Sequence, residues 1–153
     1  MSRLLAEGDD LRDLLAGARR VAVVGLSADE SRPSFGVARY LQAAGYEIIP
    51  VNPKWLGREI LGVPVVARLT DIAGGIDIVD AFRRAVDMPR VVDDAIAAGA
   101  NALWMQLGIV NEAEARRAID AGLDVVMDRC MMAEHRRLLG PKQGEAGIPR
   151  AKA

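Results

Sequence analysis

Short apolar runs alternate along the chain with segments in which apolar residues recur at helical spacing. The runs are five to seven residues long and rich in Val, Ile and Leu, which is typical of strands buried on both faces of a parallel sheet. The predicted strands are residues 21–25, 46–51, 76–82, 102–108 and 123–127. The helical spacing predicts helices over residues 4–18, 34–44, 87–99, 111–122 and 130–139.

Two of these helices begin with recognisable capping residues. Asp87 precedes Pro89 and is predicted to cap the third helix. Asn111, followed three residues later by Glu114, resembles a capping box and is predicted to start the fourth.

Two segments lack a clear periodic pattern. Residues 52–75 contain several prolines and glycines and are predicted to form an irregular crossover with at most a short helical turn. Residues 140–153 are rich in Gly, Pro and Lys and are predicted to form a mobile tail. We therefore expect one domain over residues 1–139, followed by that tail.

The repeated alternation of strand and helix predicts an α/β fold with a doubly wound, Rossmann-like parallel sheet and right-handed crossovers. The simplest arrangement of the five strands is the order 3-2-1-4-5. Ligands of such sheets bind beyond the carboxyl ends of the strands, where the winding reverses. The candidate site therefore comprises the four loops that follow Gly25, Val51, Phe82 and Gly108.

Composition and charge narrow the class of protein. Lys and Arg number 20 against 21 Asp and Glu, so the basic excess typical of a nucleic-acid binder is missing. No apolar run is long enough to span a bilayer, and the first residues do not resemble a signal peptide. The single cysteine, Cys130, excludes an internal disulfide and a cysteine-based zinc site. We expect a cytoplasmic protein that binds neither membranes nor nucleic acid.

The first candidate loop has features of a phosphate site. Gly25 permits a sharp turn beside a ligand, Ser27 offers a hydroxyl, and the amides near Ser34 to Gly36 open a helix whose N-terminus favours an anion. Arg32, just before this helix, is a further candidate to bind the ligand. The dinucleotide fingerprint GxGxxG is absent because Ser27 stands where its second glycine belongs. The alternative is an ordinary turn between strand and helix with Ser and Arg on the surface.

Lys54 follows the second strand, where an NAD enzyme usually carries an acidic residue for the ribose. A cation there suits a phosphorylated ribose, as in coenzyme A (3′-phosphate) or NADP (2′-phosphate). A solvated lysine is the alternative. In the third loop Phe82 is a candidate to pack on the ligand and Arg83 to reach a phosphate, although Phe82 in the core and solvated arginines fit equally well.

The fourth loop contributes Gln106. Strand alternation places Trp104 and Gln106 on one face of the sheet and Met105 on the other, which makes Gln106 a candidate to line the site.

The candidate catalytic groups do not combine. Cys130 and His135, the only histidine, are five residues apart, which is about 140° around a helix, so they are not expected to form a dyad. Asp80 and Asp128 end strands at opposite edges of the expected sheet. Cys130 lies near a helix start and is either a reactive thiol or a buried inert one. We therefore predict no catalytic residues, no metal site and no enzymatic activity.

Several stretches together resemble the small CoA-binding protein family, whose domain is similar to the N-terminal nucleotide-binding domain of the succinyl-CoA synthetase alpha subunit. They are VAVVGLS at 21–27, SRPSFGVARYLQAAGY at 31–46, IPVNPK at 49–54, IDIVDAFRR at 76–84, LWMQLGI at 103–109 and VVMDRCMMAEHRRL at 125–138. The resemblance covers about residues 10–138.

The resemblance implies that coenzyme A binds at the strand ends. By position, Gly25, Ser27 and Ser34 would hold the phosphates and Lys54 the ribose or its 3′-phosphate. Phe82, Arg83 and Gln106 would line the remaining groove. The synthetase also needs a phosphorylated histidine in a further domain and a partner subunit. His135 is not in a corresponding place, so thioester synthesis is not implied.

Two hypotheses for function follow. The first is a non-catalytic protein that senses, buffers or presents CoA or acyl-CoA, with a protein partner left open. The second is an NADP-dependent oxidoreductase with an atypical phosphate loop.

Overall fold

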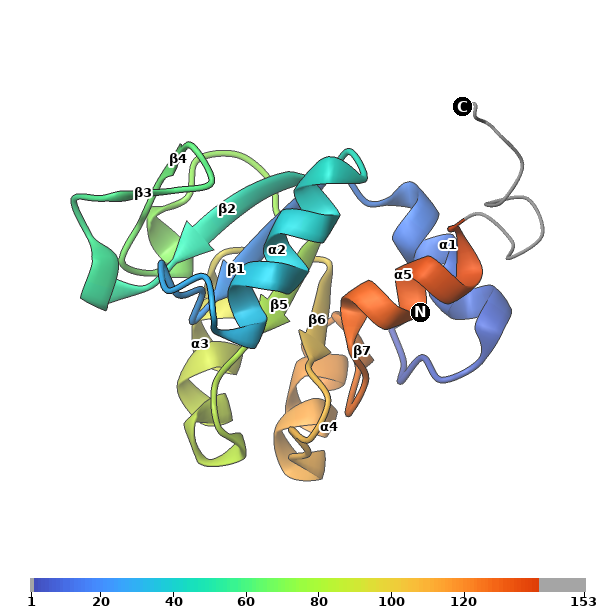
Figure 1. The fold of residues 1–153 in the computed structure, drawn as a ribbon. Coiled ribbons are helices and arrows are strands. Elements are labelled where there is room, and N and C mark those ends of the chain that lie inside the picture. Colours follow the sequence, from blue (N-terminus) through green and yellow to red (C-terminus); the bar gives the residue numbers. More distant parts are fainter. Residues whose placement is uncertain (1, 141–153) are drawn as a thin grey trace, which may run out of the picture.

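The computed structural model describes residues 2–140 and has an α/β fold built on a five-stranded sheet (Figure 1). The strands are β1 (Arg20–Val24), β2 (Glu47–Val51), β5 (Ile78–Ala81), β6 (Ala102–Met105) and β7 (Asp124–Val126). Every neighbouring pair in this sheet is parallel. The expected fold class and the five sheet strands are confirmed.

The order of the strands differs from the expected 3-2-1-4-5. The sheet runs β2-β1-β5-β6-β7. The third predicted strand corresponds to β5, and it lies between β1 and β6 rather than at the edge beyond β2. That edge is already occupied, because Val66 of the crossover bridges to Val51 of β2. The Val66 amide donates to Pro50 O (3.0 Å) and its carbonyl accepts from the Asn52 amide (2.9 Å). The winding therefore reverses between β1 and β5.

Helices cover both faces of the sheet. One face carries α1 (Gly8–Gly17), α2 (Pro33–Ala43) and α5 (Met131–Leu138), and the other carries α3 (Met88–Ala97) and α4 (Glu112–Asp120) (Figure 1). Alternation along β1 divides the core accordingly: Val21 and Val23 pack toward α2, whereas Ala22 and Val24 pack toward α3.

The crossover between β2 and β5 is more ordered than expected. It contains two 3-10 turns, η1 (Pro53–Trp55) and η2 (Leu69–Asp71), and a small antiparallel pair of strands, β3 (Glu59–Ile60) and β4 (Val63–Pro64). Leu61 (φ 55°) and Gly62 (φ 78°) connect the two strands, and positive φ at both positions is the signature of a tight hairpin turn. Strands of two residues are too short to leave a periodic pattern in the sequence.

Helix boundaries follow the expected ones except at the first helix. It begins at Gly8 rather than at residue 4, because Leu4 bridges to Val125 of β7 and the Leu5 amide donates to Val125 O (2.7 Å). The segment before α1 thus extends the sheet edge instead of the helix.

The two predicted caps have different outcomes. Asn111 caps α4 as expected, since its side chain accepts from the Glu114 amide (3.1 Å). The Asp87 side chain makes no capping bond to α3 and accepts from Arg84 Nε instead (3.2 Å). A 3-10 turn, η3 (Ala85–Asp87), precedes α3 and leaves Asp87 with αR backbone angles rather than the extended ones a cap needs.

Of the predicted tail, residues 141–153 lie outside the described residues. Within residues 2–140 no helix is both long and apolar enough to cross a membrane.

Candidate functional site

The carboxyl ends of β1, β2 and β5 meet at Gly25. Its amide donates to Val51 O (2.8 Å), and the Phe82 amide donates to Val24 O (2.8 Å). Gly25 has φ +87°, and a Cβ there would lie 2.3 Å from Phe82 O. Only glycine fits this position, because any side chain would overlap the β5 backbone. Gly25 therefore sets how closely the loops after β1 and β5 approach each other.

The loop after β1 is organised by its own polar side chains. The Ser27 amide donates to Ser34 Oγ (3.0 Å), and the Asp29 amide donates to Ser27 Oγ (3.0 Å). The Ser31 hydroxyl and amide both donate to Asp29 Oδ1, which lowers the pKa of Asp29. The two predicted phosphate-site serines are thus brought together at the N-terminal end of α2. Arg32, at the N-cap position, is exposed.

Asn52 connects three loops and was not found by sequence reasoning. It is 6 % exposed, and its Nδ2 donates to Leu26 O (3.1 Å). Its Oδ1 accepts from the Lys54 amide (3.1 Å) and from Arg83 Nη2 (3.4 Å). The Asn52-Pro53 pair is a turn signal that would have identified this residue.

Lys54 is exposed and lies beside the first loop. Its ammonium is 5.3 Å from the centre of the Trp55 ring, and the Arg58 guanidinium lies 5.4 Å from the same ring. The Lys54 charge also helps to lower the pKa of Asp29, after the larger contribution of Ser31. Asn52 is therefore contacted by the Lys54 backbone amide and by the Arg83 guanidinium, at the ends of β2 and β5.

A cavity of about 900 Å³ opens on the α3 face of the sheet, at the ends of β1 and β2. Its apolar lining includes Val24, Val51, Leu69 and Val91. Its cationic lining consists of Arg68, Arg83 and Arg90. Apolar walls with a few convergent charged groups are typical of small-molecule sites.

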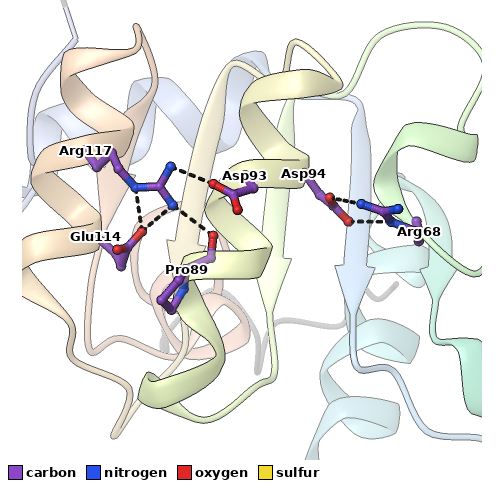
Figure 2. Close-up of polar contacts among 6 residues, drawn as sticks. All are labelled: Arg68, Pro89, Asp93, Asp94, Glu114 and Arg117. Carbon is purple, nitrogen blue, oxygen red and sulfur yellow. Dashed lines mark hydrogen bonds and ion pairs between the residues drawn. The ribbon is translucent and has the colours of Figure 1, made fainter.

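The charged residues of the cavity differ in their partners. Arg68 forms a two-pronged ion pair with Asp94, with bonds of 2.6 and 3.1 Å (Figure 2). Arg90 forms no ion pair with any carboxylate of residues 2–140. Among the described residues, the Arg83 guanidinium forms a hydrogen bond only with the amide oxygen of Asn52. Guanidinium groups without a carboxylate partner are suited to a phosphate.

Of the eight site residues predicted from the sequence, Arg83 alone lines this cavity. Gly25 and Lys54 directly follow lining residues, Val24 and Pro53. Phe82 is half-buried and packs against the core on the α2 face. Sequence reasoning missed Arg68 and Arg90, because the first lies in the irregular crossover and the second on an ordinary helix.

Gln106 lies on the face that alternation predicted, with Trp104 on the α2 side and Met105 on the α3 side. It is 4 % exposed, and its Nε2 donates to Asp80 Oδ1 within the core. Asp80 is fully buried, and its Oδ2 has no hydrogen-bond partner within residues 2–140. Burial raises the pKa of Asp80 to about 7, although the bond from Gln106 acts to lower it.

The candidate catalytic groups remain apart. His135 Nδ1 is 2.9 Å from the Tyr40 hydroxyl, and its ring packs edge-on against Tyr40 and Tyr46. Burial lowers the pKa of His135. Cys130 occupies the N-cap position of α5, and no hydrogen bond within residues 2–140 joins it to His135.

The pair Asp80 and Asp128 does not meet either, because β6 separates β5 from β7. Asp128 Oδ1 accepts from the Gly108 amide instead (2.7 Å). The two carboxyl groups therefore do not form an acid–base pair.

An ion-pair network supports the helix that forms one wall of the cavity. Arg117 of α4 binds Asp93 (2.7 Å), Glu114 (2.6 Å) and the Pro89 carbonyl (2.8 Å) (Figure 2). Two of these partners belong to α3, so Arg117 fixes α3 against α4.

Comparison with known proteins assigns the family. Residues 19–136 match the family model described as CoA binding domain. The chain belongs to this CoA-binding-domain family. The match begins just before β1 and ends within α5, so it includes all four loops at the carboxyl ends of the strands.

Relatives of the CoA-binding-domain chain extend over nearly its whole length. It is 41 % identical to the uncharacterized protein YneT of Bacillus subtilis (strain 168) over 126 residues, which are 82 % of this chain and 92 % of YneT. A Thermus thermophilus structure, cell-free ID.343, is 37 % identical with a TM-score of 0.85 and covers 88 % of this chain and 100 % of its own. The redesigned PH1109 protein Prb is 37 % identical with a TM-score of 0.86, covering 91 % and 96 %.

Proposed function

We propose that this protein binds coenzyme A or an acyl-CoA at the carboxyl ends of its strands and does not itself catalyse a reaction. The proposal rests on one observation: a CoA-binding domain has a cavity of about 900 Å³ at these strand ends, with apolar walls and arginines. An adenine ring needs apolar contact, and a 3′-phosphate needs cations. The cavity offers both.

The ligand is assigned to three neighbouring parts of the site. Adenosine occupies the cavity, and its 3′-phosphate lies between the side chains of Lys54 and Arg83, whose loops meet at Asn52. The pyrophosphate lies against the loop of Gly25, Ser27, Arg32 and Ser34, at the start of α2.

The pantetheine arm crosses Phe82, which is half-buried and so keeps part of its ring exposed. Gln106 supports the site from within the core and does not contact the ligand, because it is buried and already bonded to Asp80.

Calorimetric titration with CoA, dephospho-CoA, NADP and NAD tests the ligand class. We expect CoA to bind and dephospho-CoA to bind roughly tenfold to a hundredfold more weakly, since a charge-assisted contact contributes about 1.5–3 kcal/mol. Binding of NADP without binding of CoA would contradict the proposal and favour the oxidoreductase.

The 3′-phosphate assignment is tested by three variants with the same charge change. Lys54→Gln and Arg83→Gln should each reduce the preference for CoA over dephospho-CoA by about tenfold. Arg84→Gln is the matched control: it removes an arginine of the same loop that is 81 % exposed and paired with Asp87. An equal loss for both ligands on Lys54→Gln would refute its assignment, because the lysine would then contact a group they share.

The absence of catalysis is a separate prediction. Acyl-CoA, succinate with a nucleotide, and NADPH with simple carbonyls should all remain unchanged after prolonged incubation, as followed by chromatography. Steady turnover that disappears in Cys130→Ser would show instead that this thiol is a nucleophile.

A further inference from the structure

An exposed apolar surface adjoins the candidate site where β5 and β6 end. Val86 (70 % exposed), Leu107 (70 %) and Val110 (45 %) lie in the loops that follow these two strands. Asn111 Nδ2 donates to Ala85 O (3.0 Å), which holds the two loops together. Val86 also lines the cavity, so this apolar surface continues the cavity along the carboxyl ends of the strands.

The order of the strands fixes the direction in which an elongated ligand can lie. The cavity is at the ends of β1 and β2, and the phosphate loop follows β1. Beyond β1, the next strands across the sheet are β5 and then β6 (Figure 1). A ligand with its nucleotide in the cavity therefore brings its far end to the loop after β6, where Leu107 and Val110 are exposed.

Two carboxylates adjoin the loop that contains Leu107 and Val110. The Gly108 amide, which an anion could otherwise use, donates to Asp128 Oδ1 (2.7 Å). Glu112, two residues beyond Val110, is exposed in the first turn of α4. A carboxylate at the far end of the ligand would be repelled by both side chains. A neutral aliphatic group would instead cover exposed leucine and valine side chains.

We infer that the ligand is a CoA thioester with a neutral, aliphatic acyl group, which packs on Leu107 and Val110. This inference rests on the proposed CoA site and specifies the class of ligand that fills it. Dicarboxylic acyl groups are disfavoured at this position because of Asp128 and Glu112.

Calorimetric titration under reducing conditions with CoA, butyryl-CoA and succinyl-CoA tests the inference. The two thioesters have acyl chains of equal length and differ in the terminal carboxylate. Butyryl-CoA should bind on the order of fivefold more tightly than CoA, since part of its chain leaves water. Succinyl-CoA should bind no more tightly than CoA.

Three variants locate the effect. Leu107→Ser should remove the preference for butyryl-CoA over CoA. Asp128→Asn keeps an acceptor for the Gly108 amide and tolerates the positive φ of 62°, and it should narrow the gap between succinyl-CoA and butyryl-CoA. Leu139→Ser is the control: this exposed leucine follows α5 and lines a separate pocket near the amino ends of β1 and β2, so the preference should persist.

The outcomes distinguish a failure of the proposed CoA site from a failure of the acyl-group inference. If CoA and both thioesters fail to bind, the proposed function is wrong. If CoA binds and butyryl-CoA gains nothing, or succinyl-CoA binds more tightly than butyryl-CoA, the acyl inference alone is wrong.

Discussion

On the α3 face of the sheet, two arginines near the strand ends open into a cavity, whereas on the α2 face a bonded Asp–Gln pair is sealed in the core. Arg83 and Arg68 line the cavity and remain reachable from solvent. Asp80 and Gln106 lie on the opposite face, within the core, and bond to each other. Asp80 belongs to β5, where strand alternation turns its side chain away from the cavity, whereas Arg68 and Arg83 lie in the segments that precede and follow this strand. The same part of the chain therefore carries polar groups that can meet a ligand and polar groups that cannot.

The largest expected effect comes from a substitution of Gly25, where the loops after β1 and β5 approach each other. Gly25→Ala should destabilise the fold by about 3 kcal/mol or more and abolish CoA binding, since the new Cβ would overlap Phe82 O. Gly45→Ala is the matched control, because it has φ +111° but no atom within 4 Å of the added Cβ. It should cost only about 1–2 kcal/mol. Equal losses in chemical denaturation would show that backbone strain, not the overlap, explains the requirement for glycine.

The burial of Asp80 beside Gln106 is tested by the pH dependence of stability. The pKa of Asp80 is raised from 3.8 to about 7 in the folded protein, so the unfolded chain loses this proton first. The free energy of unfolding should therefore fall between about pH 4 and pH 7 and then level off. Asp80→Asn removes that fall and should be about 1–3 kcal/mol more stable than wild type at pH 8.

A carboxylate of opposite behaviour provides the control for Asp80. The amides of Arg20 and Arg19 donate to Asp77 and lower its pKa, so its ionised form stabilises the fold above its ordinary pKa. Asp77→Asn should lose about 1 kcal/mol at neutral pH, and the loss should vanish in acid. If the stability of the Asp77→Asn variant rises from pH 4 to pH 7, the assignment of Asp80 is wrong.

The smallest effect on stability is expected for the arginines that line or support the cavity. Solvent screens Arg68, which is 61 % exposed, but its partner Asp94 is only 12 % exposed, so Arg68→Gln should lower stability by about 1 kcal/mol. Added salt should reduce this difference. Arg117 has three partners on α3 and α4, and Arg117→Gln should cost more (Figure 2). A larger loss for Arg68 in urea titrations would mean that the cavity wall contributes more to the fold than its exposure suggests.

The sequence predicts the elements of this fold better than their order. Five apolar runs correspond to the five sheet strands, because burial on both faces requires apolar side chains at every position. The position of β5 depends on its pairing with β1 and β6, which lie far from it in sequence and which no local pattern reveals. The hairpin of β3 and β4 was missed because its two-residue strands are too short to leave a periodic pattern.

The candidate site shows a similar division. Gly25 and Lys54 were identifiable because each follows a strand end, where position in the sequence indicates position in space. Gln106 was assigned to the correct face, but its partner Asp80 could not be recognised, since the pairing spans two strands. Arg68 and Arg90 reach the cavity only through tertiary packing.

The short backbone bridges at the two margins of the sheet have a consequence for self-association. Val66 pairs with β2 at one margin and Leu4 with β7 at the other, so the outermost strands are each partly covered by the protein's own chain. Uncovered strand margins are where polypeptides recruit one another into extended aggregates. Removing residues 2–6 would expose the Val125 amide and carbonyl, which now bond to Arg3 and Leu5. The segment before α1 thus acts as a built-in barrier to strand-by-strand polymerisation.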